Sequence, residues 1–259
     1  MQESVITSLT NSRVKRLVLL QQKSAERLRE GVFVVEGVRE LERCSDAGLE
    51  ITEVYYCPAI LLQVPAVKCG AVYEVTQPVY DKIAYRGGTE GAVGIVKTRH
   101  LSLHDLQLGD SPLIVVLESV EKPGNLGAVL RSADAAGVDA VIVCDPLTDL
   151  YNPNLVRSST GAIFSVPCVA CTSEECIAYL KQRGIAILTA QLQDSQLYYD
   201  TDMKRATAIV MGTEATGLTN AWREAADAHI RIPMLGIVDS LNVSVSAAIL
   251  MYEAVKQRQ

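Results

Sequence analysis

The chain has 259 residues, of which 49% are hydrophobic and 21% are charged, and its net charge is −6. This composition excludes a disordered chain and leaves room for two ordinary domains. The pI of about 5.2 gives no overall electrostatic signal for nucleic acid, so an RNA partner would need a local basic patch.

The chain shows no targeting or membrane signal. Its N-terminus, MQESVITSLT, lacks the features of a secretory leader, and its apolar runs are far shorter than the ~18 residues that span a bilayer. An odd number of cysteines without a regular framework indicates free thiols in a reducing compartment. Cys168, Cys171 and Cys176 lie close in sequence, but no fourth zinc ligand is evident. We therefore expect a soluble, cytoplasmic protein with no membrane partner and no metal site.

The first hundred residues have the pattern of a small α/β unit. A basic helical segment at 13–29 precedes short apolar runs. Strands are predicted at 31–37, 53–57, 71–75 and 91–97, with a helix at 38–48. The stretch 98–112, TRHLSLHDLQLGDSP, is polar and aperiodic, which indicates a boundary. We expect two domains, 1–104 and 105–259.

From residue 113 onward, apolar strands alternate regularly with amphipathic helices. Strands are predicted at 113–119, 139–145, 165–170, 185–192, 207–214 and 229–234, and helices are predicted to begin near Asn125, Asn154, Ser173, Thr219 and Asn242. Continuous apolar strands separated by helices predict a parallel sheet covered on both faces. Ligands of such sheets bind beyond the carboxyl ends of the strands.

Unusual residues occur at three of these strand ends. The segments are ESVEKPGNLGAVLRSADAAG at 118–137, IVMGTEATGLT at 209–219 and IPMLGIVDSLNVSVSAAILMYEAV at 232–255. In the third, Asp239, Ser240, Asn242, Ser244 and Ser246 exceed the one or two oxygen acceptors that cap a helix. We expect the three segments to converge on one crevice.

Arg131 has two interpretations at this stage. It lies on an otherwise apolar helical face, where a guanidinium needs an anionic or carbonyl partner. Recognition of a phosphate or carboxylate satisfies that need, and so does an internal ion pair with Glu118 or Glu214. The chain lacks P-loop, dinucleotide and nucleophile-elbow motifs. The residues suit the positioning of two substrates for direct transfer.

The motifs KPGNLGAVLRSADAAG, VMGTEATGL and IPMLGIVDSLNVSVSAAILMYEA together resemble the SpoU (TrmH-like) family of RNA 2′-O-ribose methyltransferases in the SPOUT superfamily. The match covers residues 113–259, and the first hundred residues resemble, more loosely, the family's ribosomal-protein-like substrate-binding domain. The resemblance implies an α/β fold whose C-terminal parallel-sheet domain carries a deep trefoil knot. It also implies S-adenosylmethionine as cofactor, a homodimer with composite active sites, and methylation of a ribose 2′-hydroxyl in rRNA or tRNA.

The resemblance implies roles for particular residues as well. Arg131 would contact the target nucleotide, bind phosphate and stabilise the developing alkoxide, because a guanidinium stays protonated and is too weak a base. Asn125 would hold the loop and orient Arg131 or the ribose, and Glu214 would pair with Arg131 or Asn125. Ser240 and Asn242 would fix the knotted loop and face the cofactor and RNA. The implied adenosine pocket includes Thr189, Ala190, Gly212, Ile232, Met234 and Leu241.

Basic residues on both sides of the boundary are expected to contact RNA, and their alternative is a solvated surface. They are Arg13, Lys15, Arg16, Lys122 and Arg157; at Lys122 the family often has Asp. The last helix, with Ala247, Ala248, Leu250 and Met251, is either much of the dimer face or an ordinary core helix.

Two other functions compete with the ribose methyltransferase. The first is a catalytically silent RNA-binding protein with the knotted fold. Such a protein would have no need for five residues together: Asn125, Arg131, Glu214, Ser240 and Asn242. The second is a methyltransferase acting on a base nitrogen, against which the SLNVSVS signature and the spacing of Arg131 favour the ribose branch.

Overall fold

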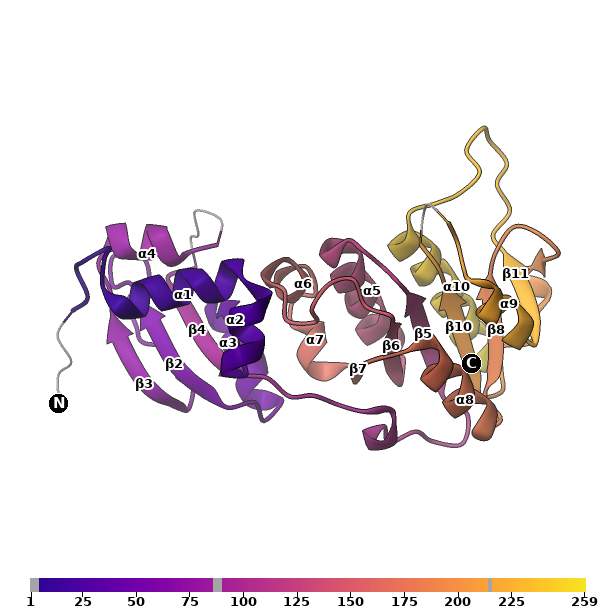
Figure 1. The fold of residues 1–259 in the computed structure, drawn as a ribbon, viewed down its shortest axis with the longest axis horizontal. Coiled ribbons are helices and arrows are strands. Elements are labelled where there is room, and N and C mark those ends of the chain that lie inside the picture. The colour runs from indigo at the N-terminus through magenta and orange to yellow at the C-terminus, as the bar shows by residue number, and fades with distance from the viewer. Residues whose placement is uncertain (1–4, 86–89, 214–215) are drawn as a thin grey trace. The chain divides into compact units, whose positions relative to one another are not determined.

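The structure is a computed structural model that describes residues 5–85, 90–213 and 216–259. The chain forms two compact units (Figure 1), Met1–Arg99 with Tyr151–Phe164, and His100–Leu150 with Ser165–Gln259. These bounds differ from the expected domains because the segment 151–164, which follows the boundary in sequence, packs within the first unit. Among the helices of the described residues, none is long and apolar enough to cross a membrane.

The first unit is built on a mixed sheet with strand order β1-β4-β2-β3. The strands are β1 (Val32–Glu36), β2 (Ile51–Tyr56), β3 (Cys69–Glu74) and β4 (Ala92–Lys97). The β2–β3 pair is parallel, and the other two pairs are antiparallel. The helices are α1 (Ser12–Gln22), α2 (Ser24–Glu30), α3 (Val38–Asp46), α4 (Gln77–Ile83), α6 (Pro153–Ser158) and most of α7 (Ala162–Ser165). Apolar residues of α1 and α4 form a core with the sheet.

The second unit contains a fully parallel sheet with strand order β7-β6-β5-β10-β8-β11-β9. The strands are β5 (Leu113–Glu118), β6 (Ala140–Cys144), β7 (Cys168–Cys171), β8 (Ala186–Ala190), β9 (Gln196–Leu197), β10 (Thr207–Met211) and β11 (Ala228–Arg231). Its α-helices are α5 (Pro123–Ala136), α8 (Ser173–Gln182), α9 (Asn220–Ala225) and α10 (Val243–Arg258), with short 3-10 turns at Leu103–Asp105 and Tyr198–Asp200.

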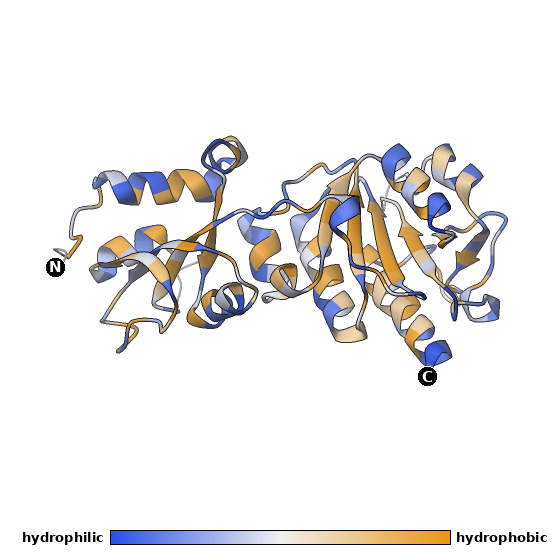
Figure 2. Ribbon diagram, turned by 90° about the horizontal axis from the view of Figure 1, so that it is seen from below, coloured by the Kyte–Doolittle hydropathy of each residue, from blue (hydrophilic) through white to orange (hydrophobic). Residues whose placement is uncertain are grey.

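Alternating side chains of these strands are buried on both faces of the sheet, as a doubly covered parallel sheet requires. On one face, Ile114 and Ile142 pack with residues of α8 and α9. Helices α5 and α10 pack against each other and against β5, β6 and β10. Figure 2 shows the hydrophobic residues concentrated in the strands, whereas the helices carry both polar and apolar positions.

The predicted α/β class, with a parallel-sheet domain and a smaller N-terminal α/β domain, is confirmed, and the differences lie at element ends and in short elements that were not predicted. The strand predicted at 229–234 ends at Arg231, and the chain then runs as a loop to Asn242. The basic segment 13–29 divides at Lys23 into two helices. Helix α4 was not predicted; its first turn contains Pro78, whose fixed φ suits a helix start.

Candidate active site

Two of the three motif segments, the 209–219 and 232–255 segments, border one cavity of the second unit, next to the ends of β8, β10 and β11. Its volume is about 340 Å³, which is within the range of small-molecule pockets. Apolar side chains, including Met211, Leu218 and Ile230, share its wall with polar loop residues. Of the residues expected to bind the cofactor, the wall includes Ala190, Gly212, Ile232, Met234 and Leu241.

Thr189, the remaining residue of the expected cofactor pocket, is fully buried and absent from the cavity wall. Its Oγ1 lies 2.6 Å from Nδ1 of His229, which is its register partner in β11. The Thr189 side chain therefore links β8 to β11, two of the strands whose ends border the cavity.

The loop after β10 is closed by two backbone hydrogen bonds between Thr213 and Gly217. The Thr213 N–H donates to the Gly217 carbonyl at 3.3 Å, and the Gly217 N–H donates to the Thr213 carbonyl at 3.1 Å. A Cβ on Gly212 would lie 2.3 Å from the carbonyl carbon of Gly217, so only glycine fits without displacing the loop. Glu214, the expected orienting carboxylate, lies outside the described residues.

The loop before α10 holds the polar residues that exceed the needs of a helix cap. Asn242 is the N-cap, and its Oδ1 accepts from the Ser244 N–H at 3.0 Å. Its Nδ2 donates to Oδ1 of Asn125 at 3.1 Å and so joins the first and third motifs. Ser240 and Ser246 line the cavity itself. The surplus polar groups therefore link the segments and shape the cavity wall.

A smaller cavity of about 130 Å³ adjoins the first. Lys122 and Asn125 contribute to its wall, and it shares Gly212, Thr213 and Val243 with the larger cavity. Residues of the first motif therefore lie beside the larger cavity and form part of the wall of the smaller one.

Arg131 lies in α5 with an exposed side chain and belongs to neither cavity wall. Of the two expected alternatives, the ion pair with Glu118 is not formed, and the buried Glu118 carboxylate accepts instead from the backbone N–H and the hydroxyl of Thr219. The other candidate, Glu214, lies outside the described residues. Within one chain, the structure brings Asn125, Ser240 and Asn242 together and leaves Arg131 at the surface.

Comparison with known proteins identifies the family. Residues 112–252 match the model of the SpoU rRNA methylase family, and residues 11–94 match the model of an MRM3-like substrate binding domain. The chain belongs to the SpoU rRNA methylase family. This membership confirms the predicted family and enzyme class.

Individual relatives agree with this SpoU-family assignment. The chain is 37% identical to the 23S rRNA (guanosine-2′-O-)-methyltransferase RlmB of Bordetella pertussis over 73% of this chain and 79% of that protein. It is 28% identical to the 23S rRNA (guanosine(2553)-2′-O)-methyltransferase RlmP of Bacillus subtilis over 95% and 97% of the two chains. The crystal structure of an AdoMet-bound rRNA methyltransferase from Sinorhizobium meliloti matches with a TM-score of 0.90 and 30% identity, over 99% of this chain and 98% of that one.

Glu118 supports the site of this SpoU-family chain in a way that the sequence pattern did not reveal. It accepts from the Thr219 N–H at 2.9 Å and from Thr219 Oγ1 at 2.7 Å, and so anchors the end of the 212–219 loop. Ser173 Oγ also lies 3.3 Å from this carboxylate and accepts from Trp222 Nε1 at 3.0 Å. In the sequence, the signal for this role of Glu118 was its position as an acidic residue at the end of an apolar strand.

Arg223 is a second residue that sequence reasoning missed. It lines the larger cavity, and its Nε is buried without a hydrogen-bond partner among the described residues. A buried guanidinium N–H of this kind is costly unless it is paired. It is therefore a candidate to bind an anionic or carbonyl group placed in the cavity.

The basic residues of the first unit differ in how they are engaged. Arg16 contacts Glu30 at 2.7 Å and Glu53 at 2.6 Å, so its guanidinium is already paired. The guanidinium of Arg13 lies 4.3 Å from the centre of the Tyr73 ring and remains exposed, as does Lys15. Arg157, which the structure groups with this unit, is exposed in α6.

Proposed function

We propose that this chain transfers the methyl group of S-adenosylmethionine to a ribose 2′-hydroxyl of ribosomal RNA. The observation that carries the proposal is the meeting of the three motifs, with the second and third lining the larger cavity and the Asn242–Asn125 hydrogen bond joining the first to the third. Family membership and the relatives named as 23S rRNA 2′-O-methyltransferases support the same reaction.

The larger cavity suits S-adenosylmethionine in size and chemistry. Met211, Leu218 and Ile230 offer an apolar surface to an adenine ring, while the backbone groups of lining residues such as Gly217 and Leu241 can bind its nitrogens. Arg223 can pair with the carboxylate of the methionine moiety. When bound, the cofactor supplies an electrophilic methyl group. The chain's own task is to place a ribose hydroxyl beside it.

The smaller cavity is the proposed entrance for the ribose. Asn125 is held by Asn242, and its amide can orient a ribose hydroxyl next to the shared wall at Gly212 and Thr213. Lys122 borders the same cavity and can bind a flanking phosphate. Glu214 keeps its proposed orienting role, although it lies outside the described residues.

Arg131 performs its proposed role across a homodimer interface. It is exposed and absent from the cavity walls of its own chain, and a partner chain packed on α5 would receive it. In the partner's site its guanidinium binds phosphate and stabilises the developing alkoxide. The proton of the 2′-hydroxyl passes to another base, since a guanidinium remains protonated.

Exposed apolar residues support the homodimer. Leu235 is 97% exposed, Ile237 is fully exposed, and Val245 and Tyr252 project from α10. Such a surface is typical of an interaction site. Ala247, Leu250 and Met251, expected as interface candidates, are fully buried in their own chain and so belong to the core. The interface therefore uses the opposite side of α10 and the 232–241 loop.

In this proposal the two domains have different roles, RNA binding and methyl transfer. Residues 1–104 bind the RNA, with Arg13 and Lys15 as exposed contacts and Arg157 from the segment that packs with the first unit. Residues 105–259 form the methyltransferase domain, in which the C-terminal polypeptide is threaded into a trefoil knot. The match to an MRM3-like substrate binding domain supports the first role. We infer that the enzyme acts in the cytoplasm.

The decisive test is transfer of labelled methyl from S-adenosylmethionine to separated rRNA and tRNA fractions. The fractions come from cells that lack this protein, so that the target ribose is unmethylated. We expect label in 23S rRNA as a 2′-O-methylated nucleoside, and its loss with Arg131→Ala. Label on a base, or label in tRNA alone, would contradict the proposed reaction or substrate. S-adenosylmethionine binding without transfer to any RNA, including ribosomal precursors, would favour the silent RNA-binding protein.

A further inference from the structure

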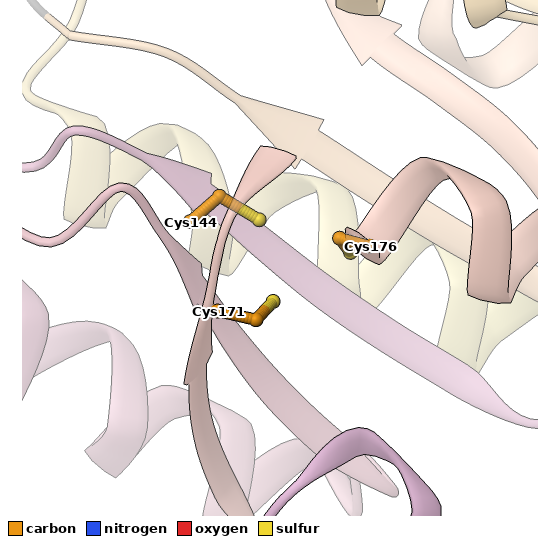
Figure 3. Close-up of side chains that lie close together, drawn as sticks. All are labelled: Cys144, Cys171 and Cys176. Atoms are coloured by element: carbon orange, nitrogen blue, oxygen red, sulfur yellow. The ribbon is translucent and has the colours of Figure 1, made fainter. Parts of the chain in front are cut away.

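Three cysteines outside the proposed active site bring their sulfur atoms together. Cys144 ends β6, Cys171 ends β7, and Cys176 lies in the first turns of α8. Their Sγ atoms all lie within 4.8 Å of one another. Figure 3 shows the three side chains gathered from two neighbouring strands and a helix. The sequence had suggested Cys168 as a neighbour of Cys171 and Cys176, but the fold places Cys144 there instead.

The cluster is enclosed but has an entrance. Cys144 and Cys176 are fully buried in the core between the sheet and α8, whereas Cys171 is partly exposed on the edge strand β7. None of the three lines the cavities of the proposed active site. An ion could therefore enter at Cys171 without passing through the methyltransferase site.

The surrounding backbone holds the sulfur atoms in position. Cys144 and Cys171 are register partners in the parallel β6–β7 pair. Helix α8 is fixed by a capping box between Thr172 and Glu175, and Ser173 at its start donates its hydroxyl to the Asp145 carboxylate at 2.6 Å. Hydrogen bonds of this kind on every flanking element favour a preorganised ligand set.

The sulfur positions match three-coordinate metal binding. For a metal–sulfur bond of about 2.3 Å, a trigonal arrangement places the sulfur atoms about 4.0 Å apart. The Sγ atoms of the cluster lie within 4.8 Å of one another, so each sulfur–sulfur distance needs to shorten by less than about 1 Å. Zinc prefers four ligands, and only three side chains of the described residues form this cluster. Thiolate ligands select soft cations such as Cu(I).

We propose that Cys144, Cys171 and Cys176 form a three-thiolate binding site for a soft cation, Cu(I). The ion replaces the thiol protons, which pass to solvent, and its bonds join β6, the edge strand β7 and α8. Binding of the ion therefore crosslinks one edge of the sheet in the methyltransferase domain. This binding does not depend on methyl transfer. The competing interpretation is that the cysteines are ordinary small core residues, as buried cysteines often are.

The test presents Cu(I), as its bicinchoninate complex, to the reduced full-length protein without oxygen. We expect the protein to withdraw about one ion per chain and its Tm to rise. X-ray absorption should show three sulfur atoms at about 2.3 Å. Cys171→Ser should weaken binding roughly 100-fold by removing one of three ligands. This residue is partly exposed at the sheet edge, so the variant is expected to fold, and circular dichroism checks that it does.

Cys168→Ser is the matched control because it lies in the same strand, outside the cluster. It should bind Cu(I) as the unchanged protein does. Failure of the unchanged protein to withdraw Cu(I) would overturn the proposal. Equal losses in Cys168→Ser and Cys171→Ser, or an absorption spectrum with fewer than three sulfur ligands, would do the same.

Discussion

Gly212→Ala is the substitution that tests the cofactor cavity most directly. Gly212 follows β10 and belongs to the walls of both cavities. A Cβ at this position would lie 2.3 Å from the carbonyl carbon and oxygen of Gly217 and 2.6 Å from the amide nitrogen of Leu218. These contacts are to backbone atoms, which cannot rotate away. The 213–218 loop must therefore move.

The size of the effect follows from the required movement. Ordinary contacts between carbon atoms are about 3.5 to 4.0 Å, so the loop must retreat by about 1 Å. Overpacking of this kind costs about 1–3 kcal/mol. If the strain is relieved by displacing the loop, binding of S-adenosylmethionine should weaken about 10- to 100-fold, since about 1.4 kcal/mol corresponds to a factor of ten.

Isothermal titration with S-adenosylmethionine measures this loss without requiring the RNA substrate. Gly109→Ala is the control, because a Cβ there meets no atom within 4 Å and the residue lines neither cavity. We expect Gly109→Ala to bind like the unchanged protein. Unaltered affinity in a correctly folded Gly212→Ala protein would refute the assignment of this cavity to the cofactor.

Three further predictions concern the dimer and the supporting residues. If Arg131 acts in the partner's site, the Arg131→Ala and Gly212→Ala proteins should each be nearly inactive. Methyl transfer should return when their subunits are exchanged to form mixed dimers. Absence of recovery would place Arg131 in the site of its own chain. Glu118→Gln replaces an acceptor of Thr219 by an amide donor and should lower the free energy of unfolding by about 2–3 kcal/mol in urea denaturation. Thr189→Val removes the hydroxyl that pairs with His229 and should cost about 1–2 kcal/mol of stability, while the S-adenosylmethionine Kd stays unchanged, because Thr189 does not line the cavity.

The hydrophobic pattern predicted most of the second unit, but not the short strand β9. Its strands are continuous apolar runs and its helices begin at recognisable caps, such as Asn242 and Thr172. These signals are local, because burial on both faces of a sheet and satisfaction of free helix amides depend on nearby residues. The motifs after β5 and β10 and before α10 were visible for the same reason, as glycines and polar residues in places where packing does not require them.

Local sequence patterns predicted a residue's role less well where that role depends on a partner that is distant in the sequence. Arg131 stands on an apolar helical face in the sequence, yet that face is partly exposed in the folded chain. Arg16, expected as an RNA contact, is paired with Glu30 and with the distant Glu53. Neither result could be deduced from spacing, because ion pairs form between side chains that only the fold brings together.

The sequence by itself determined the alternation of strands and helices, the parallel sheet and the three motifs, since each follows from burial and capping within short segments. Only the tertiary structure decided which side chains face one another. It joined Asn242 to Asn125, assigned Glu118 to Thr219 instead of Arg131, and placed Cys144 beside Cys171 and Cys176. The physical reason is that strand order and register set the contacts between residues that are distant in sequence, and neither is encoded in the pattern of any single segment.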